Sequence, residues 1–197
     1  DDFIVAAPLG RGDMGYRTIG ELDVLDVMKE IQDLYNINPD RVYLTGWSMG
    51  GLGTWRIGQF YADRFAAVAS FCGWTGISFL SNMYGAPVTY HELAGVDHNV
   101  WAEWIKGEGS QRLFEYFRSR KRDPWPKRVT LTIDHLRYGK HYWVEMLEMI
   151  APASLGSLEA EVSDARNITV KTKNVKAFAL DLRRPDLAQT GILTVNI

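Results

Sequence analysis

The residues of this chain best suited to carry out chemistry are Gly46-Trp47-Ser48-Met49-Gly50-Gly51. They follow the apolar run 41–45, which predicts a strand, and they precede residues 52–60, which predict a helix. A serine flanked by glycines between a strand and a helix is typical of a nucleophile elbow, a sharp turn that lifts a hydroxyl above the edge of a sheet. Such a turn holds the serine at sparsely populated backbone angles. We therefore predict that Ser48 is a nucleophile.

The same turn makes predictions about the neighbouring backbone. The N–H of Met49 would point at an incoming carbonyl oxygen, and the N-terminal dipole of the helix would help to stabilise an oxyanion. We expect no room for side chains at positions 46 and 50, and we expect Gly51 and Gly53 to let the helix lie close to the sheet. The alternative is a tight turn in another kind of α/β protein, in which Ser48 only caps the helix.

A serine hydroxyl is a weak nucleophile at neutral pH, so it needs a base within hydrogen-bonding distance, most often a histidine. His98 is the best candidate because it lies in a loop just after a predicted strand, where catalytic groups of parallel sheets gather. His91 is predicted inside that strand, and His135 and His141 are predicted to pack in a β-rich region. A metal site formed by His91, Asp97 and His98 is an alternative, although their spacing matches no common ligand pattern.

The base is usually oriented by a carboxylate that follows the serine and precedes the histidine in this kind of site. The carboxylates between Ser48 and His98 are Asp63, Glu92 and Asp97. None of them fits the role of the orienting acid. Asp63 belongs at the far end of the elbow helix, Glu92 lies within a predicted strand and Asp97 adjoins the histidine. We therefore expect that a strand and the loop with the acid are absent from this chain, lost near residues 76–85.

Hydrophobic patterning predicts an α/β domain with a parallel sheet flanked by helices. The expected strands are residues 3–7, 41–45, 66–71 and 87–93, and the expected helices are residues 21–35, 52–60, 101–105 and 110–118. In the first helix, an apolar stripe that includes Leu22, Leu25 and Met28 is expected to form core. In the last helix, Leu113, Phe114 and Phe117 are expected to pack on the sheet.

The pattern changes at a proline-containing linker, residues 123–128, because its prolines cannot continue a helix. After it, five stretches alternate between apolar and polar residues, which predicts a small antiparallel β module. They are residues 129–133, 158–162, 168–171, 178–182 and 193–197. We therefore expect a first domain at 1–122 and a β-rich module at 129–197.

Composition excludes several classes of partner. The net charge is −2 with both signs interspersed, so nothing in the composition indicates a nucleic-acid-binding surface, and we interpret the basic stretch 118–122 as solvated surface. The single Cys72 allows no intrachain disulfide. No apolar run approaches the ~20 residues that span a bilayer. The chain begins at Asp1 without a methionine, so we expect a removed N-terminus, and a secreted or periplasmic location stays open.

The elbow, residues 38–45 before it and residues 91–99 after it resemble the prolyl oligopeptidase branch of the α/β-hydrolases. Polyhydroxyalkanoate-depolymerase-like esterases are similar too. Residues 122–129 and Tyr142-Trp143-Val144 resemble bacterial members that append a β module to the catalytic domain. The resemblance covers most of the chain and implies Ser48 as nucleophile, His98 as general base and the Met49 N–H as one oxyanion donor.

The chain also departs from that family in two ways. Such enzymes carry a His-Gly-Gly-like loop, which supplies a second oxyanion donor, ahead of the strand expected at residue 3, and an Asp in the region where we expect a loss. Removing an oxyanion donor costs on the order of 10²–10³ in rate, and disabling the acid costs about 10⁴. We therefore expect a truncated α/β-hydrolase domain that is a poor or inactive catalyst by itself.

The expected reaction is hydrolysis of a peptide or ester bond through an acyl-enzyme, with no cofactor and with a prolyl oligopeptidase-like serine peptidase favoured. One alternative is an ester hydrolase that acts on acylated carbohydrate or polyester. The other is a non-catalytic fragment or binding module, with Tyr138, Tyr142 and Trp143 as its contact residues. The sequence gives no prediction of the oligomeric state.

Overall fold

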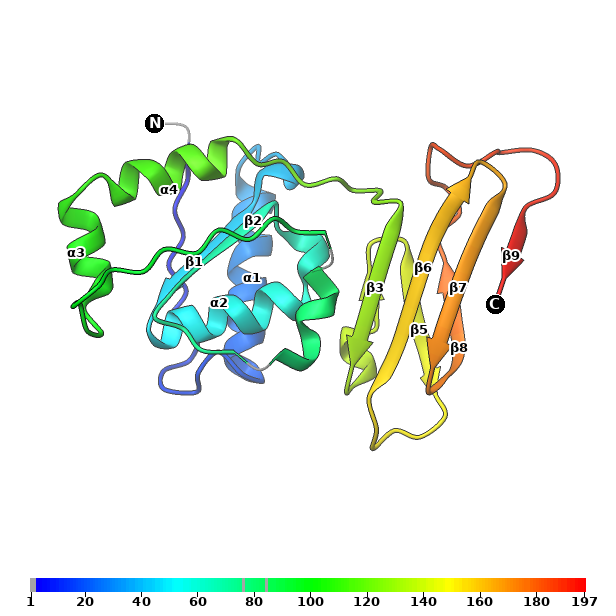
Figure 1. The fold of residues 1–197 in the computed structure, drawn as a ribbon, viewed down its shortest axis with the longest axis horizontal. Helices are drawn as coiled ribbons and strands as arrows, with labels where there is room; N and C mark the ends of the chain where they lie inside the picture. The colour runs from blue at the N-terminus through cyan, green and yellow to red at the C-terminus, as the bar shows by residue number, and fades with distance from the viewer. Residues whose placement is uncertain (1–2, 76, 84) are drawn as a thin grey trace. The chain divides into compact units, whose positions relative to one another are not determined.

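The structure, a computed structural model, describes residues 3–75, 77–83 and 85–197. The helices of the described residues are α1 (Ile19–Leu34), α2 (Met49–Phe60), α3 (Val100–Lys106) and α4 (Gly109–Arg118), with short 3-10 helices η1 (Pro39–Arg41), η2 (Ala62–Arg64), η3 (Ile77–Met83) and η4 (Leu136–Tyr138). The strands are β1 (Tyr43–Trp47), β2 (Ala67–Phe71), β3 (Arg128–Ile133), β4 (Lys140–His141), β5 (Val144–Met149), β6 (Gly156–Asp164), β7 (Asn167–Lys173), β8 (Val175–Leu180) and β9 (Thr194–Asn196) (Figure 1). None of the helices in this part of the chain has the length and apolar character needed to cross a membrane.

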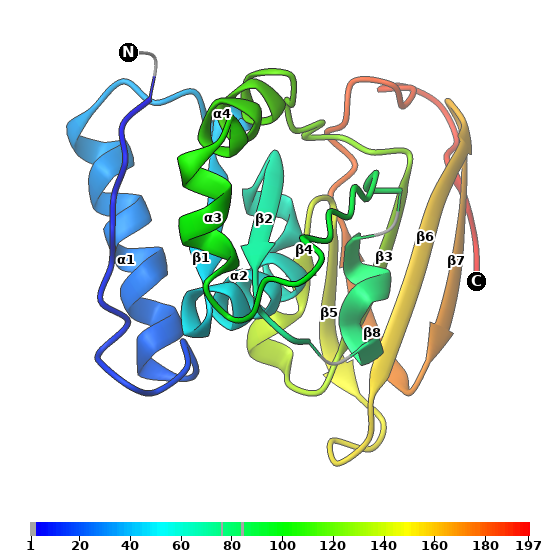
Figure 2. The same cartoon turned by 60° about the vertical axis from the view of Figure 1, so that its left-hand side comes forward.

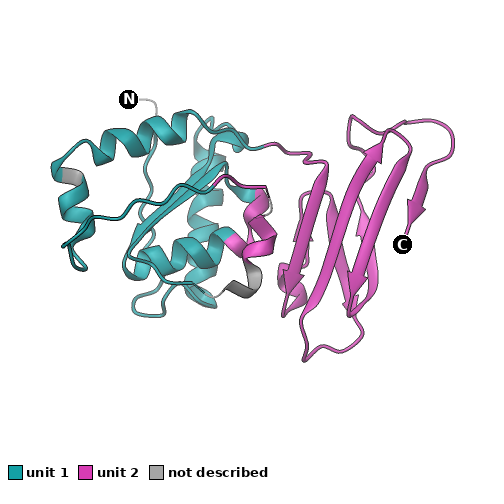
Figure 3. Ribbon diagram, in the orientation of Figure 1, with its two compact units in different colours: residues 1–58, 64–75, 88–122 teal, residues 59–63, 76–87, 123–197 magenta. Residues whose placement is uncertain are grey.

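The chain forms two compact units, which Figure 3 shows in different colours. Unit 1 comprises residues 1–58, 64–75 and 88–122, and unit 2 comprises residues 59–63, 76–87 and 123–197. The two short segments 59–63 and 76–87 thus group with the β-rich part, although sequence patterning assigned them to the first domain.

Unit 1 is built on a two-stranded parallel sheet in which α2 connects β1 to β2. The register pairs Tyr43 with Ala67 at one end and Trp47 with Phe71 at the other. The predicted parallel pairing and the helix between the strands are confirmed. Because both strands end at the same register position, the residues that follow them emerge at one edge of the sheet.

Helices pack on this strand pair through aromatic rings. The Phe117 ring of α4 stacks on the Tyr43 ring of β1 at 4.8 Å, and the Phe71 ring of β2 meets the Trp101 ring of α3 at 4.6 Å. Figure 2 shows α3 and α4 beside the two strands. Leu113 and Phe117 are buried, so the expected packing of this helix on the sheet is confirmed.

Two predicted strands are wrong. Residues 3–7 and 87–93 have no strand assignment, and within the described residues β1 and β2 pair only with each other. Val5, Val88 and Tyr90 are 78%, 83% and 80% exposed. An apolar or alternating stretch becomes a strand only when a neighbouring backbone completes its ladder, and no backbone in the described part of the chain does so for these two stretches.

The helix predicted at residues 21–35 is found as α1, but its apolar stripe is only partly core. Val24 is buried, whereas Leu22 and Leu34 are 51% and 67% exposed. The fully buried carboxylate of Glu21 instead faces Arg56 of α2, with Oε2 3.3 Å from Nε. An ion pair therefore joins α1 to α2, and Val24 is the buried member of the predicted stripe.

Unit 2 has two sheets, with strand orders β3-β6-β7-β9 and β4-β5-β8. Inward-facing residues of both sheets share one apolar core, in which Leu131, Met146 and Leu158 are at most 2% exposed. The predicted β-rich module is found, with two corrections. β7 and β9 pair in parallel, and the strands β4 and β5 were not predicted, the latter because its sequence does not alternate cleanly.

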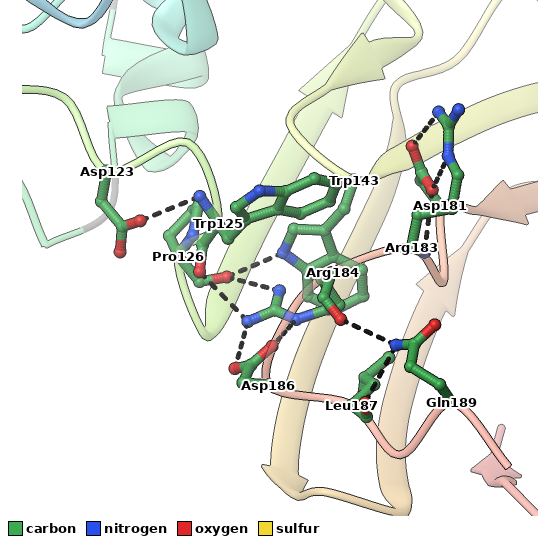
Figure 4. Close-up of polar contacts among 10 residues, drawn as sticks. All are labelled: Asp123, Trp125, Pro126, Trp143, Asp181, Arg183, Arg184, Asp186, Leu187 and Gln189. Atoms are coloured by element: carbon green, nitrogen blue, oxygen red, sulfur yellow. Dashed lines mark hydrogen bonds and ion pairs between the residues drawn. The ribbon is translucent and has the colours of Figure 1, made fainter.

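A buried arginine of unit 2 binds the backbone of linker residues Trp125 and Pro126 (Figure 4). Arg184 has no exposed surface, and its guanidinium donates to the carbonyls of Trp125 and Pro126 at 3.1 and 3.0 Å. It also pairs with the Asp186 carboxylate at 2.6 Å and lies 4.7 Å from the Trp143 ring centroid. The pKa of Asp186 is held below its usual value, mainly by the hydrogen bond from this arginine. We infer that Arg184 sets the path by which the chain enters the β module.

Candidate active site

Ser48 occupies a strained turn between β1 and α2. Its φ is +57°, in the left-handed region that non-glycine residues rarely adopt, and its N–H donates to the Phe71 carbonyl at 2.8 Å. A Cβ on Gly46 would lie 2.3 Å from the Gly50 carbonyl oxygen, so only glycine fits there. Met49 is the first residue of α2, where a backbone N–H has no acceptor within the helix and is available to a ligand.

The other glycines of the turn differ from the prediction in part. A Cβ on Gly51 would lie 2.5 Å from the Phe71 carbonyl oxygen, so the close approach of α2 to β2 at this position is confirmed. A Cβ on Gly50 would meet nothing within 4 Å, so the predicted lack of room there is wrong. The nearest atom to a Cβ on Gly53 would be in the Tyr16 ring, at 2.5 Å. That glycine accommodates a loop rather than the sheet, because it lies on another face of the helix.

The structure brings Ser48 and His98 together. The His98 Nε2 lies 2.7 Å from the Ser48 Oγ, although the two residues are 50 positions apart in the sequence. This is the distance at which an imidazole can take a proton from a hydroxyl. Ser48 is half-buried and His98 is exposed, so both an acyl group and water can reach the pair.

The remaining histidines lie elsewhere. The His91 ring lies 5.4 Å from the Trp104 ring, outside any strand. His135 is exposed and its Nδ1 accepts from the Arg137 N–H at 3.1 Å, so its predicted packing is wrong, because its polar edge caps η4 instead. His141 is buried as predicted, and its Nε2 lies 2.8 Å from the Phe60 carbonyl oxygen. Within residues 3–75, 77–83 and 85–197 no three side chains of the ligand types could hold a metal ion.

The carboxylates between the serine and the histidine do not orient the imidazole. Asp97 Oδ1 accepts from the Asn99 N–H at 2.9 Å, Glu92 is exposed and Asp63 belongs to unit 2. As far as the structure describes the chain, no carboxylate is hydrogen-bonded to His98. Among the described residues, the contact between Ser48 and His98 therefore forms without a carboxylate hydrogen-bonded to the imidazole.

Two residues next to the pair were missed by sequence reasoning. Trp47 Nε1 donates to the His98 carbonyl at 3.1 Å, and its ring lies 5.2 Å from the imidazole ring. Cys72 is exposed, with its Sγ 3.6 Å from the same carbonyl oxygen. The signal that could have found them is positional, since Trp47 ends β1 and Cys72 follows β2, which places both at the edge where Ser48 emerges.

Comparison with known families agrees with this geometry. The model of the prolyl oligopeptidase family matches residues 3–117, more than half of the 197-residue chain. The matched region contains the strained turn, Ser48 and His98, and it ends within α4. No individual curated protein matches the chain at a significant level. The chain belongs to the prolyl oligopeptidase family.

Proposed function

We propose that this chain carries the catalytic serine and base of a serine hydrolase that cleaves a peptide or ester bond through an acyl-enzyme. The observation that carries the proposal is the 2.7 Å contact between His98 Nε2 and Ser48 Oγ, formed at a strained turn where a helix begins. A serine that only capped its helix would not require a histidine from a distant loop.

In the proposed mechanism, Ser48 Oγ attacks the substrate carbonyl carbon while His98 Nε2 takes the hydroxyl proton. The Met49 N–H donates to the carbonyl oxygen as it becomes an oxyanion. His98 then gives the proton to the leaving amine or alcohol as the bond to the carbonyl carbon breaks. Water deacylates Ser48 by the same steps in reverse, with His98 again as the base. No cofactor takes part in the proposed reaction.

Peptidase activity is the first candidate because it is the activity of the family. Ester hydrolysis is the second, and the absence of a described carboxylate at His98 favours it for this chain. An amide leaving group must be protonated by the imidazolium, whose formation a carboxylate normally stabilises. An ester with a good alcohol or phenol leaving group needs less help. We therefore expect the chain to hydrolyse an activated ester faster than the amide of the same acyl group.

A fluorophosphonate probe tests the proposal directly because it forms a stable bond with an activated serine. We expect a single adduct, mapped to Ser48 by mass spectrometry, in the parent chain and none in Ser48→Ala. Ser70→Ala is a matched control, because it removes a serine hydroxyl that donates to the Gly51 carbonyl at 2.9 Å instead of facing a base. A folded parent that stays unlabelled would support the non-catalytic alternative.

A further inference from the structure

The loop that carries His98 has little structure of its own. Residues 87–93 form no strand, and hydrogen bonds within the stretch 85–99 are short-range, such as Val96 N–H to Leu93 O at 3.2 Å. A base must be held to within about 0.5 Å to act on a nucleophile. The contacts that aim the His98 imidazole must therefore come from outside its own loop.

Trp47 supplies such a contact from the strand that delivers the nucleophile. Its indole N–H donates to the His98 carbonyl at 3.1 Å, which fixes the backbone from which the imidazole extends. Its ring, tilted by 37° and centred 5.2 Å from the imidazole, limits the rotation of that side chain. Trp47 pairs with Phe71 at the end of the sheet and is bonded to Ser48. The end of β1 therefore holds both the imidazole of His98 and the hydroxyl of Ser48 in place.

The second contact to the His98 carbonyl is weaker. Cys72 follows β2 with its Sγ 3.6 Å from the carbonyl oxygen, and a thiol is a poor donor. The indole N–H is shorter and stronger. Trp47 therefore carries most of the constraint, and the described residues give His98 no carboxylate that could replace it.

We propose that Trp47 is the positioning residue of the Ser48–His98 pair, holding the base through its backbone carbonyl and through the contact between the two rings, where no described carboxylate does so. This inference rests on the proposed hydrolase function. Trp47 aims the imidazole but does not stabilise the imidazolium as a carboxylate would. It acts on how fast Ser48 is acylated, and it leaves the number of competent sites unchanged.

The test compares Trp47→Phe, which keeps a ring and removes the N–H, with Trp74→Phe, the same change at a tryptophan that is 68% exposed. We expect Trp47→Phe to slow fluorophosphonate labelling of Ser48 by about tenfold to a hundredfold, since a misplacement of about 1 Å can cost 10²-fold. The labelled fraction at completion should match the parent. Trp74→Phe should stay within about twofold of the parent, as expected for a surface change. Equal rates for Trp47→Phe and the parent would overturn the proposal.

A double-mutant cycle separates positioning from a merely structural role. In a His98→Ala background, Trp47→Phe should change the residual labelling rate by less than about twofold, because its effect passes through the missing imidazole. The same loss in both backgrounds would show that Trp47 supports the turn rather than the base, and would refute the proposal.

A measurement that does not depend on activity separates the proposed role of Trp47 from the proposed hydrolase function. The imidazole resonance of His98, assigned by its loss in His98→Ala, should shift or broaden in Trp47→Phe and stay unchanged in Trp74→Phe. If Ser48 is never labelled but the resonance responds in this way, the hydrolase proposal fails and the contact stands. An unperturbed resonance in Trp47→Phe would show that the tryptophan does not hold the base.

Discussion

Adding one methyl group to adjacent glycines of the turn should have opposite effects on stability. In Gly51→Ala the new Cβ would lie 2.5, 2.9 and 3.0 Å from Phe71 O, Gly73 N and Gly73 Cα, all of them backbone atoms. Restoring an ordinary contact of about 3.4 Å requires α2 and β2 to separate by about 1 Å. In Gly50→Ala the new Cβ would meet nothing within 4 Å.

The magnitudes follow from these distances. Overpacking typically costs about 1–3 kcal/mol, and the shift in Gly51→Ala also weakens the bond from Ser48 N–H to Phe71 O, worth about 1 kcal/mol. We therefore expect this variant to lose about 2–4 kcal/mol of unfolding free energy. Gly50→Ala should gain about 0.5–1 kcal/mol, because alanine is the better helix former.

Urea unfolding followed by circular dichroism measures both variants, with the slope of the transition checked against the parent. Gly51→Ala should also slow labelling of Ser48 by the fluorophosphonate, since the atom that holds the Ser48 N–H moves. A Gly51→Ala protein within about 0.5 kcal/mol of the parent would refute the close approach of α2 to β2. So would a Gly50→Ala protein that is the less stable of the two.

Two further predictions concern unit 2. Arg184→Met keeps the apolar stem but leaves the Trp125 carbonyl without its donor, removes one of the two donors to the Pro126 carbonyl and leaves the Asp186 carboxylate without its ion-pair partner. It should therefore cost about 2–4 kcal/mol in urea unfolding, whereas Arg183→Met, at a side chain that is 88% exposed, should cost less than about 0.5 kcal/mol. Equal effects would contradict the anchoring role. Burial lowers the pKa of His141 more strongly than the nearby Asp63 charge and the Phe60 carbonyl raise it. As the pH drops through about 6.5, the unfolded chain therefore binds a proton at His141 that the folded chain does not bind. The unfolding free energy should have its full value above pH 6.5 and should decrease at lower pH by up to about 1.4 kcal/mol per pH unit. His141→Gln should flatten that dependence over pH 5–6.5, and an unchanged slope would show that His141 is not its source.

The sequence was most informative where local geometry decides the structure. The elbow requires glycine at position 46 and a serine at positive φ, and both follow from the short sequence around Ser48. The helix itself begins at Met49, three residues before its predicted start at residue 52. The apolar alternation of residues 129–133 and 158–162 likewise predicted strands, because each strand buries one face in a shared core.

Predictions failed where the outcome depends on a distant partner. Residues 3–7 and 87–93 have the composition of strands, but no described backbone pairs with them. The contact of Trp47 with His98 could not be predicted, because it depends on where a loop without secondary structure returns to the sheet. The burial of Arg184 was not predicted, since nothing in its local sequence shows that two carbonyls from residues 125–126 and the Trp143 ring surround it.

The rate at which a fluorophosphonate labels Ser48, compared between the parent and His98→Ala, tests the central claim most directly. General-base assistance contributes about 10²–10⁴ to such a step, so we expect His98→Ala to be slower by at least about 10²-fold. His91→Ala, at a histidine outside the pair, should label at the rate of the parent. Labelling of Ser48 at the same rate with and without His98 would contradict the claim that the two residues act together.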